Sequence, residues 1–284
     1  MLKKPFLLMT VLLFLQSCSP VDVLNEFVPT DGYTVQKNIH YGEQERQNLD
    51  IYLPPNLHKN TPVALFFHGG SWQYGDKDDY LFLGQGLVSE GFIVVIANYR
   101  LYPEVTFPAF LEDNAKAVAW VHKHIAQYGV SNRNITLVGH SAGAYNAVML
   151  ALDERYLKQV GMKPSQLAGV VGLSGPYDFL PIRGRKFNAI FSPKEKQDSM
   201  EPVYYVRAGA PRLLLLTGDE DGLVSPENSK KLAGLLKAKG NDVSLIEYNG
   251  VGHYGIAAGF ATPISWNDEV RKDIADFIRQ GRKQ

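Results

Sequence analysis

The sequence predicts an α/β fold in which a doubly wound, mostly parallel sheet of about eight strands carries helices on both faces. Continuous apolar runs such as Val63–Phe67 and Phe92–Ala97 are typical of strands buried on both faces of a parallel sheet. Helical patterns alternate with these runs along the chain. With 45% hydrophobic and 20% charged residues over 284 positions, the composition is that of an ordinary globular protein with one large core.

Residues 1–18 have the pattern of a signal peptide. Lys3 and Lys4 precede an apolar run over residues 6–15, which is too short to cross a bilayer. The run ends in Leu15-Gln16-Ser17-Cys18, which resembles the bacterial lipoprotein signal. That resemblance implies export across the inner membrane and a lipid-anchored chain that faces the periplasm or the cell exterior, with Cys18 as the lipidated residue. Simple secretion with a free thiol is the alternative.

The main domain is expected over residues 35–284. Residues 19–34 carry Pro20, Pro29 and Gly32 without a strong period, which indicates a tether or lead-in. Two short strands, over 35–40 and 47–53, then flank a turn, and the second alternates apolar and polar positions as a half-buried strand does. We expect them to form an antiparallel pair at the start of the sheet.

Strands and helices alternate through the middle of the chain. A helix over 80–90 ends at Gly91 and lies between the strands 63–67 and 92–97. Apolar positions at helical spacing predict a long amphipathic helix over 108–128 that stops at Gly129. A further strand begins at Ile135.

Three more strands and two helices complete the pattern. The strands are expected over 168–173, 212–217 and 243–248, and the helices over 226–239 and 267–280. The connection over residues 175–211 is the one long insertion, and we interpret it as a small cap-like segment beside a fairly open pocket. The sequence contains neither a repeat nor a low-complexity tract.

Gly139-His140-Ser141-Ala142-Gly143 is the motif around which we expect the chemistry to be organised. A strand that turns sharply into a helix lifts its serine above the sheet, in a strained backbone that only small neighbours tolerate. The apolar run before Ser141 and the Ala-rich pattern after it provide that context, so Ser141 is the predicted nucleophile. A chance occurrence in a chain with 26 glycines is the alternative.

A serine nucleophile needs a base and an acid that orients the base. Of the seven histidines, only His253 follows the candidate acids, in a glycine-flanked loop after the last strand. Two loops offer the acid: residues 217–224, which contain Asp219, Glu220 and Asp221, and the loop that contains Asp178. Either loop could reach His253, because both follow strands of the same sheet.

Backbone donors for a developing negative charge are expected after the strand 63–67. That strand leads directly into His68-Gly69-Gly70-Ser71-Trp72, where glycines let N–H groups approach an oxyanion without a Cβ in the way. The predicted donors are Gly69, Gly70 and Ala142.

Taken in order, these motifs resemble those of α/β-hydrolase serine esterases. The resemblance spans roughly residues 49–277 and includes Tyr99-Arg100-Leu101-Tyr102-Pro103 as well as the motifs above. The chain is similar to the hormone-sensitive-lipase-like carboxylesterases. The motif His-Gly-Gly-x-Trp at residues 68–72 is similar to that of the kynurenine-formamidase and deacetylase branch. The resemblance implies Asp221 as the acid, from its Asp-x-x-Val spacing. Arg100 follows a buried strand and Asp113 lies on the next predicted helix, which indicates a structural ion pair between them.

We therefore predict a carboxylesterase that forms an acyl-enzyme on Ser141, acts on short-chain, aryl or acetyl esters, and needs neither cofactor nor metal. An arylformamidase or peptidase-type amide hydrolase is the first alternative, and a catalytically silent binding protein with the same fold is the second. The formal net charge of +0 offers no basic face for nucleic acid, so the expected partners are a small-molecule ester and, through Cys18, a membrane. Aromatic side chains are candidates for the pocket wall: Trp72, Tyr74, Tyr145, Phe187, Phe191, Tyr204 and Tyr205.

Overall fold

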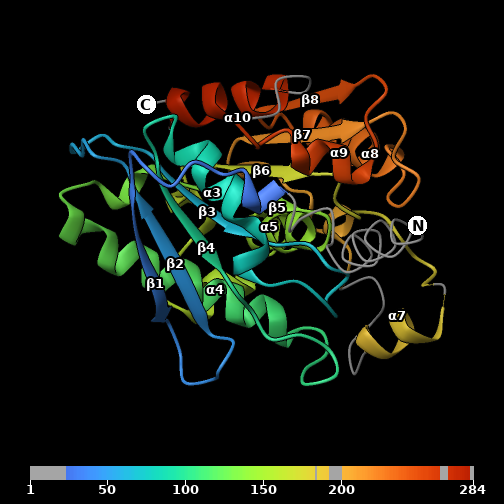
Figure 1. The fold of residues 1–284 in the computed structure, drawn as a ribbon. Coiled ribbons are helices and arrows are strands. Elements are labelled where there is room, and N and C mark those ends of the chain that lie inside the picture. Colours follow the sequence, from blue (N-terminus) through green and yellow to red (C-terminus); the bar gives the residue numbers. More distant parts are fainter. Residues whose placement is uncertain (1–23, 183, 192–199, 263–267, 282–284) are drawn as a thin grey trace, which may run out of the picture.

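One eight-stranded sheet forms the centre of the computed structural model, which describes residues 24–182, 184–191, 200–262 and 268–281 (Figure 1). The strand order is β1-β2-β4-β3-β5-β6-β7-β8. β1 pairs with β2, and β2 with β4, in antiparallel fashion, whereas the other neighbours are parallel. The predicted fold class and the antiparallel start are therefore confirmed. The strands are β1 (Thr34–His40), β2 (Asn48–Leu53), β3 (Val63–Phe67), β4 (Ile93–Ala97), β5 (Ile135–His140), β6 (Gly169–Leu173), β7 (Leu213–Gly218) and β8 (Val243–Tyr248).

Helices cover both faces of this sheet (Figure 1). On one face, α4 (Ala109–His124), α5 (Ala142–Leu152) and α8 (Glu227–Ala238) share a core cluster with the strands. On the other face, the second cluster contains residues of α3 (Leu81–Val88), α9 (His253–Ala258) and α10 (Asp268–Gln280). Within β3, Leu65 and Phe67 belong to the first cluster and Ala64 and Phe66 to the second, because successive side chains of a strand point to opposite faces.

Three short helices were not predicted from the sequence: α6 (Glu154–Gln159), α7 (Arg185–Ile190) and α9. Each has six residues, which is too few to show a helical period. α7 lies in the long connection over residues 175–211, of which residues 183 and 192–199 are outside the described part. The expectation that His253 lies in a loop is wrong, because His253 is the first residue of α9.

The lead-in is packed against the domain from residue 24 onward. The side chain of Asn25 donates to the backbone oxygens of Asp78 and Asp79 and accepts from the N–H of Phe82. Val28 joins the second core cluster. Residues 1–23, and with them Cys18, lie outside the described residues. In the described ranges, no helix has both the length and the apolar character to span a bilayer.

The predicted Arg100–Asp113 ion pair is confirmed. The guanidinium donates to both carboxylate oxygens, at 2.7 Å from Nε and 2.8 Å from Nη2, and the Asp113 side chain is fully buried. The side chain of Gln47 and the backbone N–H of Arg100 also donate to this carboxylate, at 2.6 Å and 3.2 Å. This cluster fastens the loop after β4 to α4, because the carboxylate belongs to the helix and its donors come from outside it.

Candidate active site

Ser141 lies at the sharp turn between β5 and α5, with φ 55° and ψ −120°. Positive φ is uncommon for a residue that carries a Cβ and marks backbone strain. The N–H of Ser141 donates to the backbone oxygen of Leu173 at the end of β6 (2.8 Å), which holds the turn against the sheet. The side chain borders a cavity above the carboxyl ends of the strands.

Two glycines make this turn possible. A Cβ on Gly139 would lie 2.2 Å from the backbone oxygen of Gly143, and a Cβ on Gly143 would lie 2.0 Å from that of Phe67. Real Cβ atoms do not approach backbone atoms this closely, so neither glycine can be replaced without moving the turn at Ser141. The sequence argument for small neighbours around Ser141 thus has a direct steric basis.

His253 and Asp221 form a buried hydrogen-bonded pair. Nδ1 of His253 lies 2.8 Å from Oδ2 of Asp221, and the two side chains are 6% and 0% exposed. The other carboxylate oxygen accepts the N–H groups of Leu223 and Val224. Burial alone raises the pKa of Asp221, but the N–H of Val224 and the contact with His253 outweigh it, so this pKa lies below its usual range.

The other candidate acids have different partners. Asp178 borders the cavity, but its carboxylate is paired with Lys231 Nζ at 2.6 Å. Asp219 accepts the N–H of Gly250 and so holds the turn after β8, while Glu220 is exposed. Of the four carboxylates considered, Asp221 is therefore the one that contacts His253.

His140 is a buried residue that connects the turn at Ser141 to the backbone of His253. Its ring nitrogen Nε2 donates to the backbone oxygen of His253 at 3.0 Å, and the two rings lie 4.8 Å apart between centroids. Burial, together with the neighbouring His253, lowers the pKa of His140 to about 3. A neutral ring is thus fixed between Ser141, its chain neighbour, and the backbone of His253.

The loop after β3 brings Gly69 and Gly70 to the same cavity. Gly70 has φ +114°, and a Cβ there would lie 2.1 Å from the backbone oxygen of Tyr74, so only glycine fits. The N–H of Gly69 donates to the hydroxyl of Tyr80 at 3.2 Å. Within the described residues, the N–H groups of Gly70 and Ala142 have no protein acceptor.

The cavity has a volume of about 1210 Å³ and mainly apolar walls. Of the proposed aromatic lining residues, Trp72, Phe187 and Phe191 border it. Tyr74, Tyr145, Tyr204 and Tyr205 do not, and Tyr145 is fully buried with its hydroxyl bonded to Met200. The cavity also has walls that the sequence did not indicate, from five separate segments: Leu24, Tyr80, Phe179, Leu223 and Tyr254.

No group of three or more His, Cys, Asp or Glu side chains suited to a metal ion is present in the described part of the chain. Two polar contacts of the candidate site were missed by sequence reasoning. Tyr80 contacts Gly69, and Asn146 accepts the indole N–H of Trp72 at 3.0 Å. A buried tryptophan normally has an acceptor, so Trp72 was a signal for a polar partner, although the sequence does not say which one.

Residues 49–236 match the BD-FAE family. Among curated proteins, the chain is 31% identical over 241 residues to the probable isoprenylcysteine alpha-carbonyl methylesterase ICME of Oryza sativa subsp. japonica, covering 77% of this chain and 58% of that protein. It is 34% identical over 145 residues to the kynurenine formamidase of Salmo salar, covering 51% of this chain and 47% of that protein. The chain thus spans about half of the length of these relatives.

A solved structure of a truncated carbohydrate esterase from gut microbiota has the same fold. It superposes with a TM-score of 0.77 at 22% identity and covers 89% of this chain and 98% of its own. At this identity the likeness concerns the fold, so the family assignment depends on the sequence match over residues 49–236.

Proposed function

The chain belongs to the BD-FAE family and has the α/β-hydrolase fold, and from this premise we propose that it is a serine carboxylesterase. The observation that carries the proposal is the buried pair of His253 and Asp221. His253 borders the same apolar cavity as the strained Ser141. A serine hydroxyl with a base and an orienting acid is the arrangement that acyl transfer needs.

In the proposed reaction, Oγ of Ser141 attacks the ester carbonyl carbon while Nε2 of His253 takes the serine proton. The Asp221 carboxylate holds Nδ1–H and stabilises the imidazolium that forms. The tetrahedral intermediate collapses as His253 protonates the departing alcohol, which leaves an acyl-enzyme. Water, deprotonated by His253, then attacks the acyl carbonyl, and the acid leaves with Ser141 restored.

The negative charge on the carbonyl oxygen is proposed to be stabilised by the N–H groups of Gly70 and Ala142. Both are backbone groups of residues that border the cavity, and neither is used by a protein acceptor among the described residues. Gly69, the third predicted donor, has its N–H on Tyr80. In our proposal, Gly69 contributes through its missing side chain, because a Cβ there would lie 3.2 Å from Cβ of Ser141.

The proposed substrates are short-chain, aryl or acetyl esters of small molecules. The aromatic wall formed by Trp72, Phe187 and Phe191 favours an apolar or aromatic group on one side of the ester. The name of the rice relative, a methylesterase, is in line with an alcohol portion that is small.

Hydrolysis of an aryl formamide is the second candidate function. It is favoured by His-Gly-Gly-x-Trp at residues 68–72 and by the match to a kynurenine formamidase over 145 residues. The same nucleophile, base and acid would act, with an amine instead of an alcohol as the leaving group.

The decisive experiment compares p-nitrophenyl esters from acetyl upward, acetylated xylan and N-formylkynurenine as substrates. We expect the esters to be turned over faster, a fluorophosphonate probe to label Ser141, and Ser141→Ala to lose both activity and label. Faster turnover of the formamide would select the second candidate. A folded wild-type protein that the probe does not label would instead indicate a binding protein without this chemistry.

We further propose that the chain is exported and anchored to a membrane through a lipidated Cys18. The support is the sequence pattern of residues 1–18, with its basic start, short apolar run and terminal cysteine. Metabolic labelling with a palmitate analogue tests it. Label on the wild type and none on Cys18→Ser is expected, and a label that survives the substitution would exclude Cys18 as the site.

A further inference from the structure

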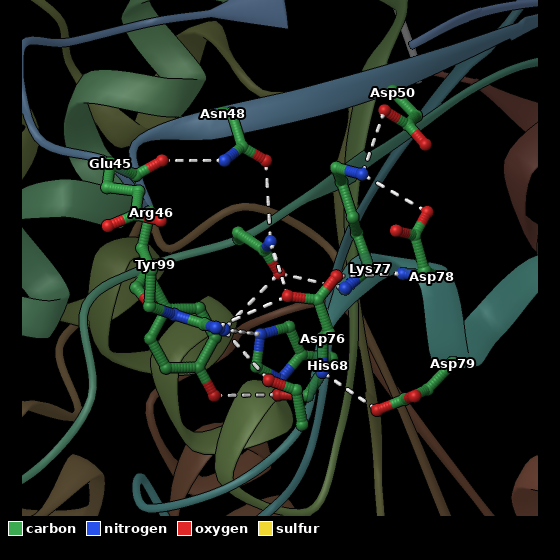
Figure 2. A network of polar contacts seen from close by, with 12 residues as sticks. Glu45, Arg46, Asn48, Asp50, His68, Asp76, Lys77, Asp78, Asp79 and Tyr99 are labelled. Carbon is green, nitrogen blue, oxygen red and sulfur yellow. Dashed lines mark hydrogen bonds and ion pairs between the residues drawn. The ribbon is translucent and has the colours of Figure 1, made fainter. Parts of the chain in front are cut away.

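Arg46 is an inward-pointing arginine that the proposed reaction does not use. It lies between β1 and β2, and its side chain is 25% exposed. Figure 2 shows Arg46 beside His68 and Tyr99. Its guanidinium donates to the backbone oxygens of Tyr99 (2.9 Å) and Gly75 (2.8 Å) and pairs with Asp76 at 3.2 Å. One side chain thus holds the segments after β3 and after β4 together.

His68, the first residue of the loop after β3, is fully buried beside Arg46 (Figure 2). Its ring stacks on Tyr99 with centroids 4.4 Å apart, and burial lowers its pKa to about 4, so the ring is neutral near pH 7. Nδ1 lies 2.7 Å from the backbone oxygen of Gly69. A carbonyl oxygen only accepts, so Nδ1 carries the hydrogen.

Arg46 favours the same tautomer from the other side of the ring. Its Nη2 lies 3.5 Å from Nε2 of His68, and a guanidinium can only donate. A hydrogen on Nε2 would point at this cation, whereas a bare Nε2 presents a lone pair to it. The side-chain oxygen of Asn98, the other acceptor nearby, already receives the backbone N–H of Lys77 at 2.8 Å and a longer contact from Arg46.

The His68 tautomer determines the direction of the Gly70 N–H. The peptide between Gly69 and Gly70 is planar and trans, so its C=O and its N–H point in opposite directions. His68, which is fully buried and does not border the cavity, holds this C=O toward itself, so the N–H points away from His68. A Cβ on Gly75 would lie 2.6 Å from the Gly69 oxygen and 2.7 Å from Nδ1, so Gly75 covers this bond, and Arg46 fastens Gly75.

We propose that Arg46 is a positioning residue for the proposed oxyanion donors. Arg46 holds His68 in its Nδ1–H tautomer and holds Gly75 over the hydrogen bond between His68 and Gly69. In this way it directs the Gly70 N–H toward the oxyanion. The inference rests on the proposed esterase function. The inference adds that stabilisation of the transition state depends on Arg46, a remote side chain on the opposite side of the His68 ring from Gly69.

Arg46→Met tests the proposal through steady-state kinetics on p-nitrophenyl acetate. Because an oxyanion donor acts on the transition state, we expect kcat to fall about 10- to 100-fold while KM changes less than about threefold. Arg212→Met is the matched control. Arg212 also donates hydrogen bonds to backbone oxygens, those of Phe277 and Gly281 at the end of α10. None of these three residues borders the cavity. We expect it to keep kcat within about twofold.

A spectroscopic measurement tests the tautomer directly and needs no variant. The ¹⁵N shifts of the His68 ring in the wild type are expected to show a protonated Nδ1 and a bare Nε2 near pH 7. In Arg46→Met we expect the two shifts to approach each other as the tautomers mix. His68→Asn, whose amide nitrogen replaces Nδ1–H, is expected to keep more of kcat than His68→Leu.

Three outcomes would overturn the proposal: an Nε2–H tautomer in the wild type, an unchanged kcat in folded Arg46→Met, or equal losses in His68→Asn and His68→Leu. If Arg46→Met does not fold, the wild-type shifts and the two His68 variants still decide. Failure of the esterase function is recognised separately, because the wild type would then neither react with a fluorophosphonate nor hydrolyse the ester.

Discussion

The indole N–H of Trp72 donates to the side-chain oxygen of Asn146 at 3.0 Å, although 74 positions separate them in the sequence. Trp72 is 3% exposed and Asn146 is fully buried. The bond joins the loop after β3, which carries Gly70, to α5, which begins next to Ser141. The proposed oxyanion donor Gly70 and the proposed nucleophile are thus held at a fixed separation by a polar contact inside an apolar core.

Trp72→Phe is expected to lower the free energy of unfolding by about 1–3 kcal/mol, because it leaves a buried amide oxygen without its donor. Urea denaturation measures the loss. Trp120→Phe is the matched control, since Trp120 is only half-buried on α4 and its ring stacks on His124. Equal losses in the two variants would contradict a special role for the Trp72–Asn146 bond.

Asp221→Asn is expected to reduce kcat by about 10³- to 10⁴-fold, because an amide in place of the carboxylate no longer stabilises the imidazolium or fixes its tautomer. Asp178→Asn, at the edge of the same cavity but paired with Lys231, is expected to stay within about fivefold of the wild type. Steady-state kinetics on one ester decides between them. If Asp178→Asn lost activity while Asp221→Asn kept it, Asp178 and not Asp221 would be the acid that orients His253.

Acid is expected to destabilise the fold through His68 and His140. Burial lowers the pKa of these side chains to about 4 and about 3 in the folded state, while an unfolded histidine titrates near pH 6.5. Below about pH 6.5 the unfolded chain therefore binds protons that the folded chain does not, and the free energy of unfolding falls by about 1.4 kcal/mol per pH unit for each histidine.

Urea titrations at pH 7, 6 and 5 measure this slope. We expect His140→Phe to reduce the slope by roughly one histidine's contribution, whereas replacement of the exposed His58 by Gln leaves it unchanged. A slope that is identical in His140→Phe and the wild type would show that His140 does not contribute.

Lys77→Met is expected to destabilise the protein by about 3–5 kcal/mol, because it removes the cation that faces the fully buried Asp50 carboxylate at 3.2 Å. The control is Lys37→Met, which breaks a 3.8 Å contact with Asp78 between side chains that are more than half exposed, and for which at most about 1 kcal/mol is expected. Thermal or urea unfolding distinguishes them. If both losses are small, water reaches Asp50 in the folded protein.

The sequence predicted the sheet well because the buried strands are continuous apolar runs, whose type does not depend on distant partners. Helices α6, α7 and α9 escaped prediction because six residues show no period and tertiary contacts decide their conformation. For the same reason the expected loop at His253 is the first turn of a helix.

The candidate site was only partly predictable. Ser141 and His253 could be identified from their motifs and their order along the chain, and Asp221 from its resemblance to the acid loop of α/β-hydrolases. The structure brings Asp221 and His253 into contact. Their catalytic roles stay predictions. Arg46 and Asn146 could not be identified, because each acts through contacts with residues more than 20 positions away that a local pattern does not contain.

The walls of the cavity have a different origin from the groups proposed to react. Leu24 precedes the first strand, Phe187 belongs to α7 in the insertion, and Leu223 and Tyr254 are 64% and 73% exposed. None of these four side chains is part of the sheet that supports the turn at Ser141. Mutations at them can therefore accumulate with little loss of stability, so a lineage carrying this fold can change which molecules it accepts while its reaction stays the same.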